Sequence, residues 1–541
     1  MTNLTPYAGR WVALIGEEVV GVGHTADEAS HLARRNRPRE RPLLRFVEAP
    51  GGEPLPLSPL LARLRPLLDA QAEPVYLVGG AVRDALLGRT SHDLDFVAPQ
   101  QAIKLAYRVG DALGEPAYAL DRARDTGRVV LSAQQMTLDF ARFRGVDLEA
   151  DLRDRDFTVN ALALPATAQT LASLIDPCGG LADLRARRLR LTHPAALTHD
   201  PVRALRAVRL AHSLGFTLEE ATAQALAAAA PLLAQTSAER VRDELLKLLQ
   251  TAAPHAAMQD LHALGLLAVV LPEIAALAGV AQSPPHHEPV LDHTFSVLRR
   301  LAQVETAVLS ADPLEPPLTA VRAALAPFAA DLRAHLARPV AGGVDGRLLL
   351  RLGALFHDVG KPATQTVEDG RIRFIGHDRA GAGLAAGRLR ALAMSKEAVG
   401  HVRLIVAHHM RPLFLVEAQL HGSPPSRRAV YRFFRAAQAA GPDVALLTLA
   451  DHLATHAGAG PAAAWQALVD LAANLLQAYF VFPTEAVKPA PLLKGRDLMA
   501  ALDLPPGPEV GRLLRLIEEA QAAGELRSRD EALAFARRSR Q

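Results

Sequence analysis

The chain has a single cysteine and no long uncharged hydrophobic run. Cys178 alone cannot form a disulfide within the chain, and so low a cysteine content is typical of a reducing compartment. No apolar stretch is long enough and free enough of charge to span a bilayer, and the first residues lack the basic-then-apolar pattern of a signal peptide. We therefore expect a cytoplasmic protein with no membrane partner.

A strong excess of one charge is also missing, since the net charge is only +3. The 541 residues, 50% of them hydrophobic, are enough for several domains with sizeable cores. Almost all basic residues are Arg, and some form blocks, as in residues 185–190. A local basic face suits an RNA partner, although such a block also fits the solvated face of a helix in an Arg-rich protein.

Two short motifs near residues 75–95 carry the most information. Residues 75–78 are predicted to form a short buried strand that ends in Gly79-Gly80, a pair that lets backbone N–H groups approach phosphate oxygens. A helix then starts near Ala81, and the next strand carries Asp93 and Asp95. Because side chains alternate along a strand, both carboxylates lie on one face, spaced to hold two divalent ions. Either motif alone is more often a surface loop, but together they predict a nucleotidyl-transfer site.

The order of these motifs resembles the head of the DNA polymerase β-like nucleotidyltransferases, and later segments resemble the class II tRNA nucleotidyltransferase and poly(A) polymerase family. The resemblance implies two Mg²⁺ ions on Asp93 and Asp95, and Asp139 is a candidate third carboxylate on the strand of residues 137–140. The residues that it assigns to the substrate are Gly79, Gly80, Arg83, Arg155, Asp156, Asn160, Asp200, Arg203, Arg206 and Arg209.

The segment from Arg155 to Leu162 looks like the family's ribose-selecting segment, in which Asp156 and Asn160 hydrogen-bond to sugar hydroxyls. The chain departs from the family at Asp154, where members usually carry a second basic residue. Residues 176–184 are similar to the family's Asp-Pro-x-Gly-Gly turn, to which we assign a structural role.

Residues 199–209 resemble the family's base-reading helix. Cytosine and adenine both present an amino donor beside a ring-nitrogen acceptor, so Asp200 can accept from the amino group while Arg203 donates to the ring. Uracil and guanine present the opposite polarity and would leave both side chains unpaired. His199 stands where most members have Glu. The alternative is an ordinary helix start with arginines on a solvated face.

Ser237 begins an amphipathic helix in which Arg240 and Glu244 lie one turn apart. This spacing alone predicts only a surface ion pair of little energetic weight. In the family the corresponding residues brace the base-reading helix, so the resemblance implies a positioning role here.

A second set of polar residues is dispersed through the C-terminal half. Imidazoles and carboxylates together suit Mn²⁺, Fe²⁺, Ni²⁺, Co²⁺ or Mg²⁺ rather than a thiolate zinc site. The segment around His357-Asp358 looks like the signature of the HD phosphohydrolase superfamily, and Lys361 would contact a phosphate. The expected ligands are His293, His357, Asp358, His377, His408 and Asp451, while His377 and His409 also fit satisfied surface residues.

These motifs predict an α+β protein, in which a polymerase β-like head with a small mixed sheet is followed by a mainly α-helical neck, HD domain and tail. We expect a ββαβ unit in residues 1–50, the head in 60–190, the neck in 191–280, the HD domain in 281–465 and the tail in 466–541. Residues 49–59 are predicted to be a linker. The oligomeric state stays open.

The predicted function is addition of nucleotides from CTP and ATP to the tRNA 3′ end, with an HD phosphohydrolase in the same chain. A poly(A) polymerase with the same head would accept unrelated RNA ends and use only ATP. An HD phosphohydrolase with a merely nucleotide-sensing head would not need the intact Asp93 and Asp95 pair.

The segment before the ribose-selecting residues favours addition of C alone. Family members that build the whole CCA end carry a flexible loop there, whereas residues 145–154 are predicted to be a turn that runs into a helix. The family's C-only branch has a similar shortening. We therefore expect CC addition, with full CCA addition as the alternative.

Overall fold

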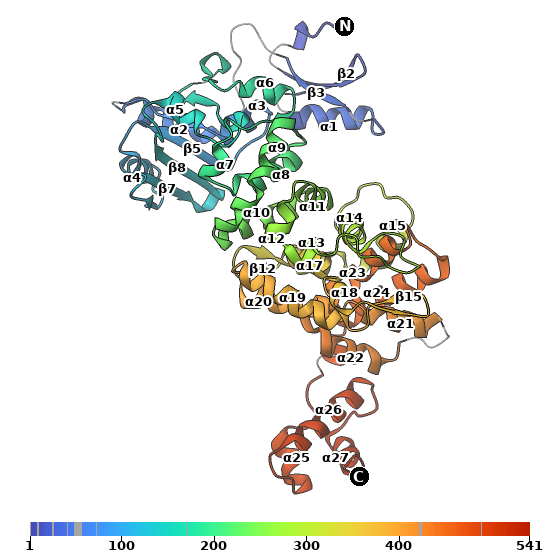
Figure 1. Cartoon of the computed structure of the whole chain (residues 1–541). Coiled ribbons are helices and arrows are strands. Elements are labelled where there is room, and N and C mark those ends of the chain that lie inside the picture. The colour runs from blue at the N-terminus through green and yellow to red at the C-terminus, as the bar shows by residue number, and fades with distance from the viewer. Residues whose placement is uncertain are drawn as a thin grey trace. The chain divides into compact units, whose positions relative to one another are not determined.

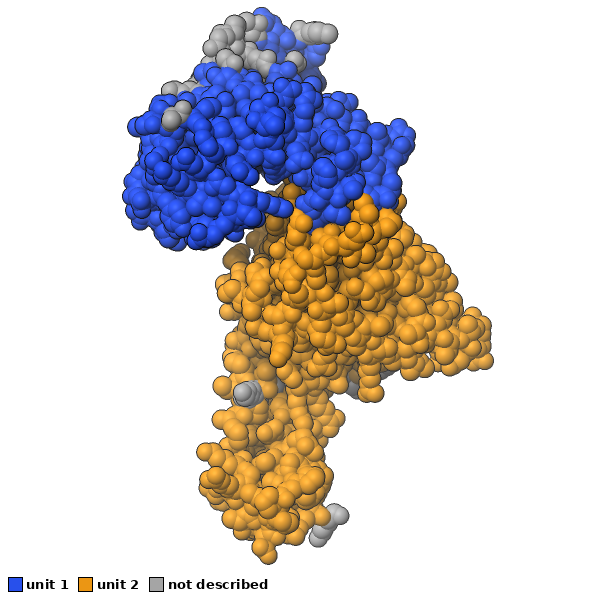
Figure 2. Space-filling model, turned by 60° about the vertical axis from the view of Figure 1, so that its left-hand side comes forward, with its two compact units in different colours: residues 1–203, 214–229 blue, residues 204–213, 230–541 orange. Residues whose placement is uncertain are grey.

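The computed structural model describes residues 2–7, 10–23, 26–40, 42–47, 57–71, 73–168, 170–420, 425–487 and 489–540. The chain forms two compact units, residues 1–203 with 214–229 and residues 204–213 with 230–541 (Figure 2). Among the helices described, none combines the length and the apolar character needed to cross a membrane.

The N-terminal residues form a small antiparallel sheet in the order β2-β1-β3, with one helix (Figure 1). The elements are β1 (Trp11–Ile15), β2 (Glu18–Gly23), α1 (Ala26–Asn36) and β3 (Leu43–Phe46). Gly21 lets α1 lie close on β2, because a Cβ there would collide with the backbone oxygen of Ala29. This is the expected ββαβ order, while most of the predicted linker lies outside the described residues.

A six-stranded mixed sheet in the order β6-β7-β8-β5-β4-β9 forms the centre of the head. β5 and β8 pair in parallel, and the other neighbours are antiparallel. The strands are β4 (Tyr76–Val78), β5 (Asp93–Ala98), β6 (Ala117–Asp121), β7 (Thr126–Leu131), β8 (Met136–Arg142) and β9 (Ala163–Pro165). This sheet confirms the α+β class predicted from the sequence.

Apolar residues of the strands pack into two clusters that include helices of the head. Leu77 and Phe96 face a core shared with α2 (Pro59–Asp69) and α4 (Ala102–Leu113), in which Phe96 stacks on Phe140 at 4.8 Å between ring centroids. Val78 and Val97 face a second cluster that includes Leu152 of α5 (Leu148–Arg153). The sheet is therefore held rigidly at the strands that carry the acidic residues.

Short helices follow the sheet. α3 (Gly80–Leu86) begins directly after β4, and α6 (Gly180–Arg185) begins at the Asp-Pro-x-Gly-Gly turn. The Asp176 carboxylate accepts hydrogen bonds from the Gly180 and Leu181 N–H groups at 2.7 and 2.9 Å. A Cβ on Gly180 would collide with the Thr158 carbonyl oxygen, so the turn needs this glycine for close packing. The other helices of the first unit are α7 (Ala196–His199) and α9 (Glu220–Ala229).

The second unit is mainly helical (Figure 1). Its first part contains α10 (Ala238–Gln250), α11 (Pro254–Ala263), α12 (Leu266–Val270) and α13 (Pro272–Ala275), and α8 (Arg203–Leu214) belongs mostly to it. The central helices are α14 (Val290–Leu309), α15 (Leu318–Leu325), α16 (Ala329–Ala337), α17 (Gly346–Phe356), α18 (Lys361–Thr364), α19 (His377–Ala391), α20 (Lys396–His408), α21 (Arg411–Leu420), α22 (Arg427–Ala437), α23 (Gly441–Thr455) and α24 (Ala462–Phe480). The last three are α25 (Gly495–Leu502), α26 (Pro508–Ala522) and α27 (Arg529–Arg538), which share a small core of their own.

Short strand pairs lie within or directly before the mainly helical part that the sequence predicts from residue 191 onward. They are β10 (Arg188–Leu189) with β11 (Thr217–Leu218), β12 (Pro339–Val340) with β13 (Val344–Asp345), and β14 (Thr366–Glu368) with β15 (Arg371–Arg373). The β14–β15 hairpin turns at Asp369 and Gly370, which both have positive φ. An Asp-Gly pair is a typical signal for a two-residue hairpin, so this pair was visible in the sequence.

Candidate active sites

Three carboxylates lie together on two neighbouring strands of the head. Asp93 and Asp95 project from β5, and Asp139 of β8 lies directly beside Asp95 in the parallel register. Burial raises the pKa of Asp95; Arg155 acts against this rise, whereas Asp139 and Asp93 add to it. A group of carboxylates that repel one another in this way fits divalent cations, which would relieve the repulsion.

Two of the three carboxylates already have partners. The Thr137 hydroxyl donates to Asp93 at 2.6 Å, and Arg128 donates to both oxygens of Asp139 at 2.7 Å. This hydrogen bonding raises the pKa of Arg128 above its ordinary value. A metal ion at Asp139 would have to share that carboxylate with Arg128, a partner that sequence reasoning missed.

The turn at Gly79-Gly80 places main-chain atoms close to charged side chains. Gly79 caps α3 with a φ of 75°. A Cβ there would lie 3.3 Å from Nη1 of Arg155 and 3.4 Å from Oδ2 of Asp95. Arg155 is itself held by Asp151, which accepts from its Nη2 at 2.9 Å. The structure thus gathers Gly79, expected at the triphosphate, Asp95, expected at the metal ions, and Arg155, expected among the substrate-binding residues.

A chain of hydrogen bonds joins Arg83, expected at the triphosphate, to the two residues expected at the ribose. Arg83 donates from Nη1 to Oδ1 of Asn160 at 2.5 Å, and Asn160 donates from Nδ2 to Oδ1 of Asp156 at 2.9 Å. The same Asp156 oxygen accepts from the Phe157 N–H at 2.8 Å. These side chains hold one another in place, so their polar groups are oriented in advance.

Asp200 and Arg203 lie next to each other where α8 begins, with 3.9 Å between Oδ2 and Nε. The Arg203 Nη groups donate to the carbonyl oxygens of Ala196, Arg155 and Asp154 at 3.2–3.4 Å. This buried guanidinium is therefore fixed by main-chain oxygens.

Further along α8, Glu244 of α10 contacts Nε of Arg206 at 3.3 Å and Nε of Arg209 at 2.7 Å. Glu244 is 5% exposed, so α10 braces α8 as expected of this residue.

The two positions at which the chain departs from the family pattern lie beside each other. Nδ1 of His199 is 3.4 Å from Oδ1 of Asp154, and Asp154 also offers its carbonyl oxygen to Arg203. Where the family has a basic residue and a glutamate, this chain has an acidic residue and a histidine in contact.

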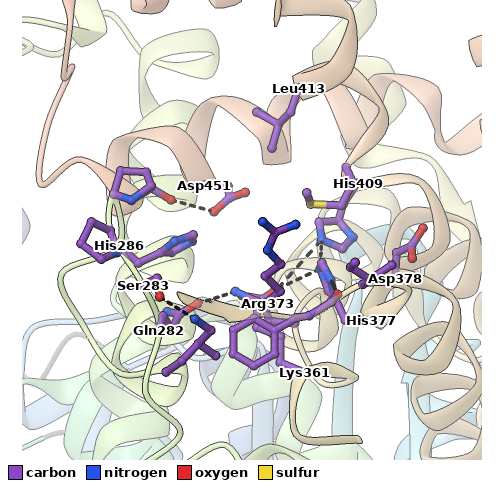
Figure 3. A pocket seen from close by; sticks show the side chains of 18 of the residues that line it. Gln282, Ser283, His286, Lys361, Arg373, His377, Asp378, His409, Leu413 and Asp451 are labelled. Carbon is purple, nitrogen blue, oxygen red and sulfur yellow. Dashed lines mark hydrogen bonds and ion pairs between the residues drawn. The ribbon is translucent and has the colours of Figure 1, made fainter. Parts of the chain in front are cut away.

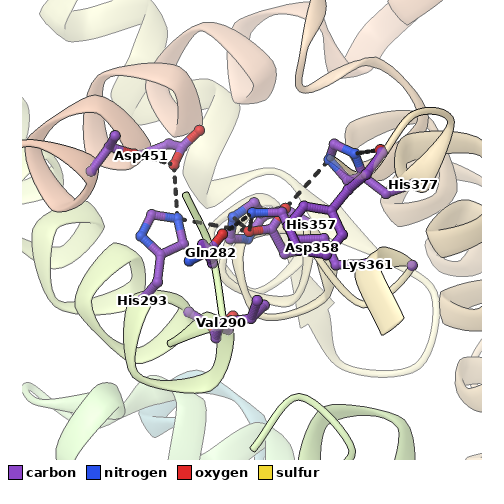
Figure 4. A network of polar contacts seen from close by, with 12 residues as sticks. Gln282, Val290, His293, His357, Asp358, Lys361, His377 and Asp451 are labelled. Atoms are coloured by element: carbon purple, nitrogen blue, oxygen red, sulfur yellow. Dashed lines mark hydrogen bonds and ion pairs between the residues drawn. The ribbon is translucent and has the colours of Figure 1, made fainter. Parts of the chain in front are cut away.

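Among its described residues, the second unit holds two groups of three metal-type ligands, and Figure 4 shows all of them except His409 labelled. One group is His293, His357 and Asp451, and the other is Asp358, His377 and His409. His293 and Asp451 come from α14 and α23, and they approach to 3.1 Å between Nε2 and Oδ1. His357 and Asp358 follow α17 and place an imidazole and a carboxylate 3.1 Å apart. Five of the six predicted ligands are thus brought together.

His409, and not the predicted His408, faces the cluster. His409 is 3% exposed, and its Nε2 lies 3.2 Å from Nε2 of His377 and 4.0 Å from Oδ1 of Asp358. His408 lies outside the cluster, where burial and Arg411 lower its pKa. Successive helical residues point about 100° apart, so only one of two adjacent histidines can face the cluster.

Hydrogen bonds set the tautomer of three of these histidines. Nδ1 of His357, His377 and His409 donates to the carbonyl oxygen three residues earlier, each at 2.7 Å. In the neutral imidazole this leaves Nε2 as the acceptor atom that faces the cluster, the orientation typical of metal-binding histidines. Within the described part of the chain, Nε2 of His293 and His357 has no hydrogen-bond partner. This donor set fits divalent transition metals.

Asp358 is the shared carboxylate of the cluster. Burial favours its neutral form, but His357 and Lys361 hold its pKa well below the usual range. Lys361 Nζ lies 2.6 Å from Oδ2 of Asp358 and 5.3 Å from the centre of the Phe374 ring. The lysine that we expected at a phosphate is thus ion-paired to the carboxylate in this structure.

A cavity of about 670 Å³ opens onto the cluster (Figure 3). Arg371 and Arg373 of β15 line it together with Phe374 and Phe414, so it combines cationic and aromatic surfaces. His286 also lines it, and burial, with Lys361 and His293, lowers the pKa of His286 to about 4. This histidine is neutral at pH 7, and the sequence analysis missed it.

Family models match the chain along most of its length. They describe the poly A polymerase head domain (residues 75–190), a probable RNA and SrmB-binding site of polymerase A (215–277), the HD domain (328–455) and a putative tRNA nucleotidyltransferase domain 2 (471–536). Residues 4–50 match a family of unknown function.

Similar proteins point the same way. A CC-adding tRNA nucleotidyltransferase of Thermus thermophilus is 37% identical over 85% of this chain and 92% of its own length. An A-adding tRNA nucleotidyltransferase of Deinococcus radiodurans is 36% identical over 88% of this chain and 98% of its own. A solved CCA-adding enzyme in an apo form has a TM-score of 0.56 at 19% identity, covering 88% and 92% of the two chains, which shows a common fold. The chain therefore belongs to the tRNA nucleotidyltransferase family and carries an HD domain.

Proposed function

We propose that this enzyme adds two C residues to the 3′ end of tRNA from CTP and releases pyrophosphate. The observation that carries the proposal is the meeting of Asp95, Gly79 and Arg155 beside two further carboxylates. In-line attack of the tRNA 3′-hydroxyl on the α-phosphate needs a held triphosphate and a place for divalent ions. Mg²⁺ on Asp93 and Asp95 would, when bound, activate the hydroxyl and neutralise the leaving pyrophosphate.

The other residues bind and orient the nucleotide. Gly80 offers its backbone N–H group to the triphosphate, whereas the Gly79 N–H donates to the Leu162 carbonyl oxygen at 3.3 Å, so that Gly79 contributes the tight turn. Arg83 and Arg155 offer guanidinium groups. Asp156 and Asn160 select ribose. Asp200 and Arg203 read the amino group and ring nitrogen of the base. Glu244 aligns Arg206 and Arg209 along α8, where they would contact the substrate.

The segment before the ribose-selecting residues supports the C-only proposal. α5 is capped by Asp147, which accepts from the Ala150 N–H at 2.8 Å. Asp151 is fully buried, accepts from the Arg144 N–H at 3.0 Å and holds Arg155. This ordered connection leaves little chain for a mobile loop. Addition of A alone is a second candidate, since the two curated relatives described above are similar to this chain to nearly the same degree.

Substrate choice separates this proposal from a poly(A) polymerase. We expect labelled CTP to enter a tRNA that ends at its discriminator base and not an unstructured RNA with the same last nucleotides. Incorporation of ATP alone into both RNAs would favour the polymerase.

We also propose that the HD domain hydrolyses a phosphoester of a nucleotide or RNA end. His293, His357, Asp358, His377, His409 and Asp451 would hold two ions such as Mn²⁺, Ni²⁺, Co²⁺ or Fe²⁺, which when bound would activate water. Arg371 and Arg373 supply positive charge at the cavity, and the aromatic side chains suit a nucleobase. To test this activity, the release of phosphate from nucleoside monophosphates is measured with Mn²⁺ or Ni²⁺. We expect release with either ion and none after chelation.

For the organisation of the chain we propose the five parts expected from the sequence, with the head in residues 60–190 and the HD domain in 281–465. The separate cores of the head and of the last three helices support this division.

A further inference from the structure

The N-terminal ββαβ unit has a core of its own but no assigned role. Ala13, Val20, Ala29 and Ala33 are almost fully buried and form this core. The two groups of metal-type ligands found in the described residues both lie far along the sequence, in the second unit. The chemistry of the N-terminal unit is therefore sought on its surface.

Charge is distributed unevenly in this unit. Residues 34–45 contain six arginines and one glutamate, whereas residues 17–28 contain four acidic residues and no basic ones other than His24. Arg34 and Arg35 occupy the last turn of α1, and Arg37 and Arg39 follow directly. All four side chains are exposed. The C-terminal end of α1 is thus a compact source of positive charge.

Three of these arginines have no acidic partner among the described residues. Arg37 donates to Glu18 at 3.0 Å, which neutralises it. Across the parts of the chain that the structure describes, Arg34, Arg35 and Arg39 form no ion pair or side-chain hydrogen bond. Arginines at a helix C-terminus offset the helix dipole, but that accounts for the last turn only and not for Arg39. We call Arg34, Arg35 and Arg39 the α1 basic surface.

We propose that the α1 basic surface binds the sugar-phosphate backbone of the tRNA substrate, away from the nucleotide site. Guanidinium groups match phosphate oxygens with paired hydrogen bonds, and exposed arginines of one sign attract a polyanion. This inference rests on the proposed function in one respect, namely that tRNA is the substrate. The unit would add affinity for the body of the tRNA and leave the chemical step unchanged.

The test uses the full chain and a tRNA that ends at its discriminator base, without nucleotide. Binding is measured at several salt concentrations for the wild type and for the triple variant Arg34→Gln, Arg35→Gln, Arg39→Gln. The logarithm of the binding constant falls with the logarithm of the salt concentration, and each lost phosphate contact makes this slope less steep by about 0.9. For the triple variant we therefore expect a slope that is less steep by up to about 3, and binding at least tenfold weaker at low salt. The kcat and the KM for CTP should stay unchanged.

Arg37→Gln is the matched control, because Glu18 already neutralises this arginine. Its effect on the slope should be smaller than that of Arg34→Gln, Arg35→Gln or Arg39→Gln alone. The folding of each variant is checked by circular dichroism. An unchanged slope and affinity in the triple variant, or an equal effect of Arg37→Gln, would overturn the inference. If binding depends on the three arginines but no CTP is incorporated, the inference stands and the proposed function fails.

Discussion

Adjacent histidines mark the limit of what sequence could tell about the HD site. His408 and His409 share composition and neighbours, and only the angle at which α20 ends decides which one meets His377. Of the five other predicted ligands, His357 and Asp358 were indicated because polar residues after an apolar helix run need a partner when buried. The resemblance to the HD superfamily indicated His293, His377 and Asp451. The residue types of a cluster are thus easier to predict than the direction in which each helical side chain points.

His409→Ala should therefore remove hydrolysis at the HD site, whereas His408→Ala should keep it. The first change takes an Nε2 lone pair from the cluster, and the second changes a side chain outside it. Calorimetric titration with Mn²⁺ would show lower affinity or stoichiometry for His409→Ala alone. An equal loss of Mn²⁺ binding in both variants would indicate that His408 is also a ligand.

Asp443 stands out among the residues that the motifs did not indicate. It is fully buried on α23, and its Oδ2 lies 3.0 Å from Nε2 of His335 and 2.8 Å from Nε2 of His401. An ionised carboxylate only accepts hydrogen bonds, so His335 donates from Nε2, while Nε2 of His401 also lies 3.0 Å from Nη2 of Arg338. Burial alone would raise the pKa of Asp443, but His335 and His401 hold it well below the usual range.

Asp443→Asn should lower the stability of the second unit by about 3–5 kcal/mol near pH 7, the usual cost of removing one partner of a buried pair. Because the folded-state pKa is depressed, the contribution of Asp443 is present above about pH 4 and is lost as the pH falls towards the folded value. Thermal unfolding should give a constant gap between wild type and variant from pH 5 to 8, narrowing below pH 4. A gap that instead widens on acidification would contradict this account.

At the scale of elements, the strands and turns of the head were largely predictable. Alternation placed Asp93 and Asp95 on one face, and the Gly-Gly pair marked the start of α3. The sequence could not show that β8 lies beside β5 in parallel, because strand order depends on contacts between distant segments. For the same reason Arg128 was missed as the partner of Asp139, and the Asp369-Gly370 hairpin was overlooked within a helical pattern.

The bracing of α8 by α10 gives a prediction at this scale. Glu244→Gln removes the charge that meets Arg206 and Arg209 and should cost about 1.5–3 kcal/mol, the value of a hydrogen bond to a charged group. Asp243→Asn is the control, since this exposed neighbour pairs only at the surface with Arg242. Urea unfolding and the kcat/KM for CTP should both fall for Glu244→Gln and stay near wild type for Asp243→Asn. Equal stability of the two variants would show that Glu244 does not brace α8.

At the scale of the whole molecule, the two chemistries use different ligand types in different units. The head offers carboxylates, which suit Mg²⁺, whereas the HD cluster mixes imidazoles with carboxylates. Asp95→Ala should abolish nucleotide addition and spare hydrolysis, and Asp358→Asn should do the reverse. Labelled-CTP incorporation with Mg²⁺ and phosphate release with Mn²⁺, measured on both folded variants, check this separation. Loss of both activities in either variant would refute two independent sites.

The most direct test of the central claim is the length of the product at single-nucleotide resolution. A tRNA that ends at its discriminator base is incubated with CTP and ATP together, and a CC-ended tRNA is incubated with ATP in parallel. The ordered segment from Arg144 to Arg155 predicts that the first tRNA gains two nucleotides and the second gains none. Efficient conversion of the CC-ended tRNA to a CCA end would contradict the account.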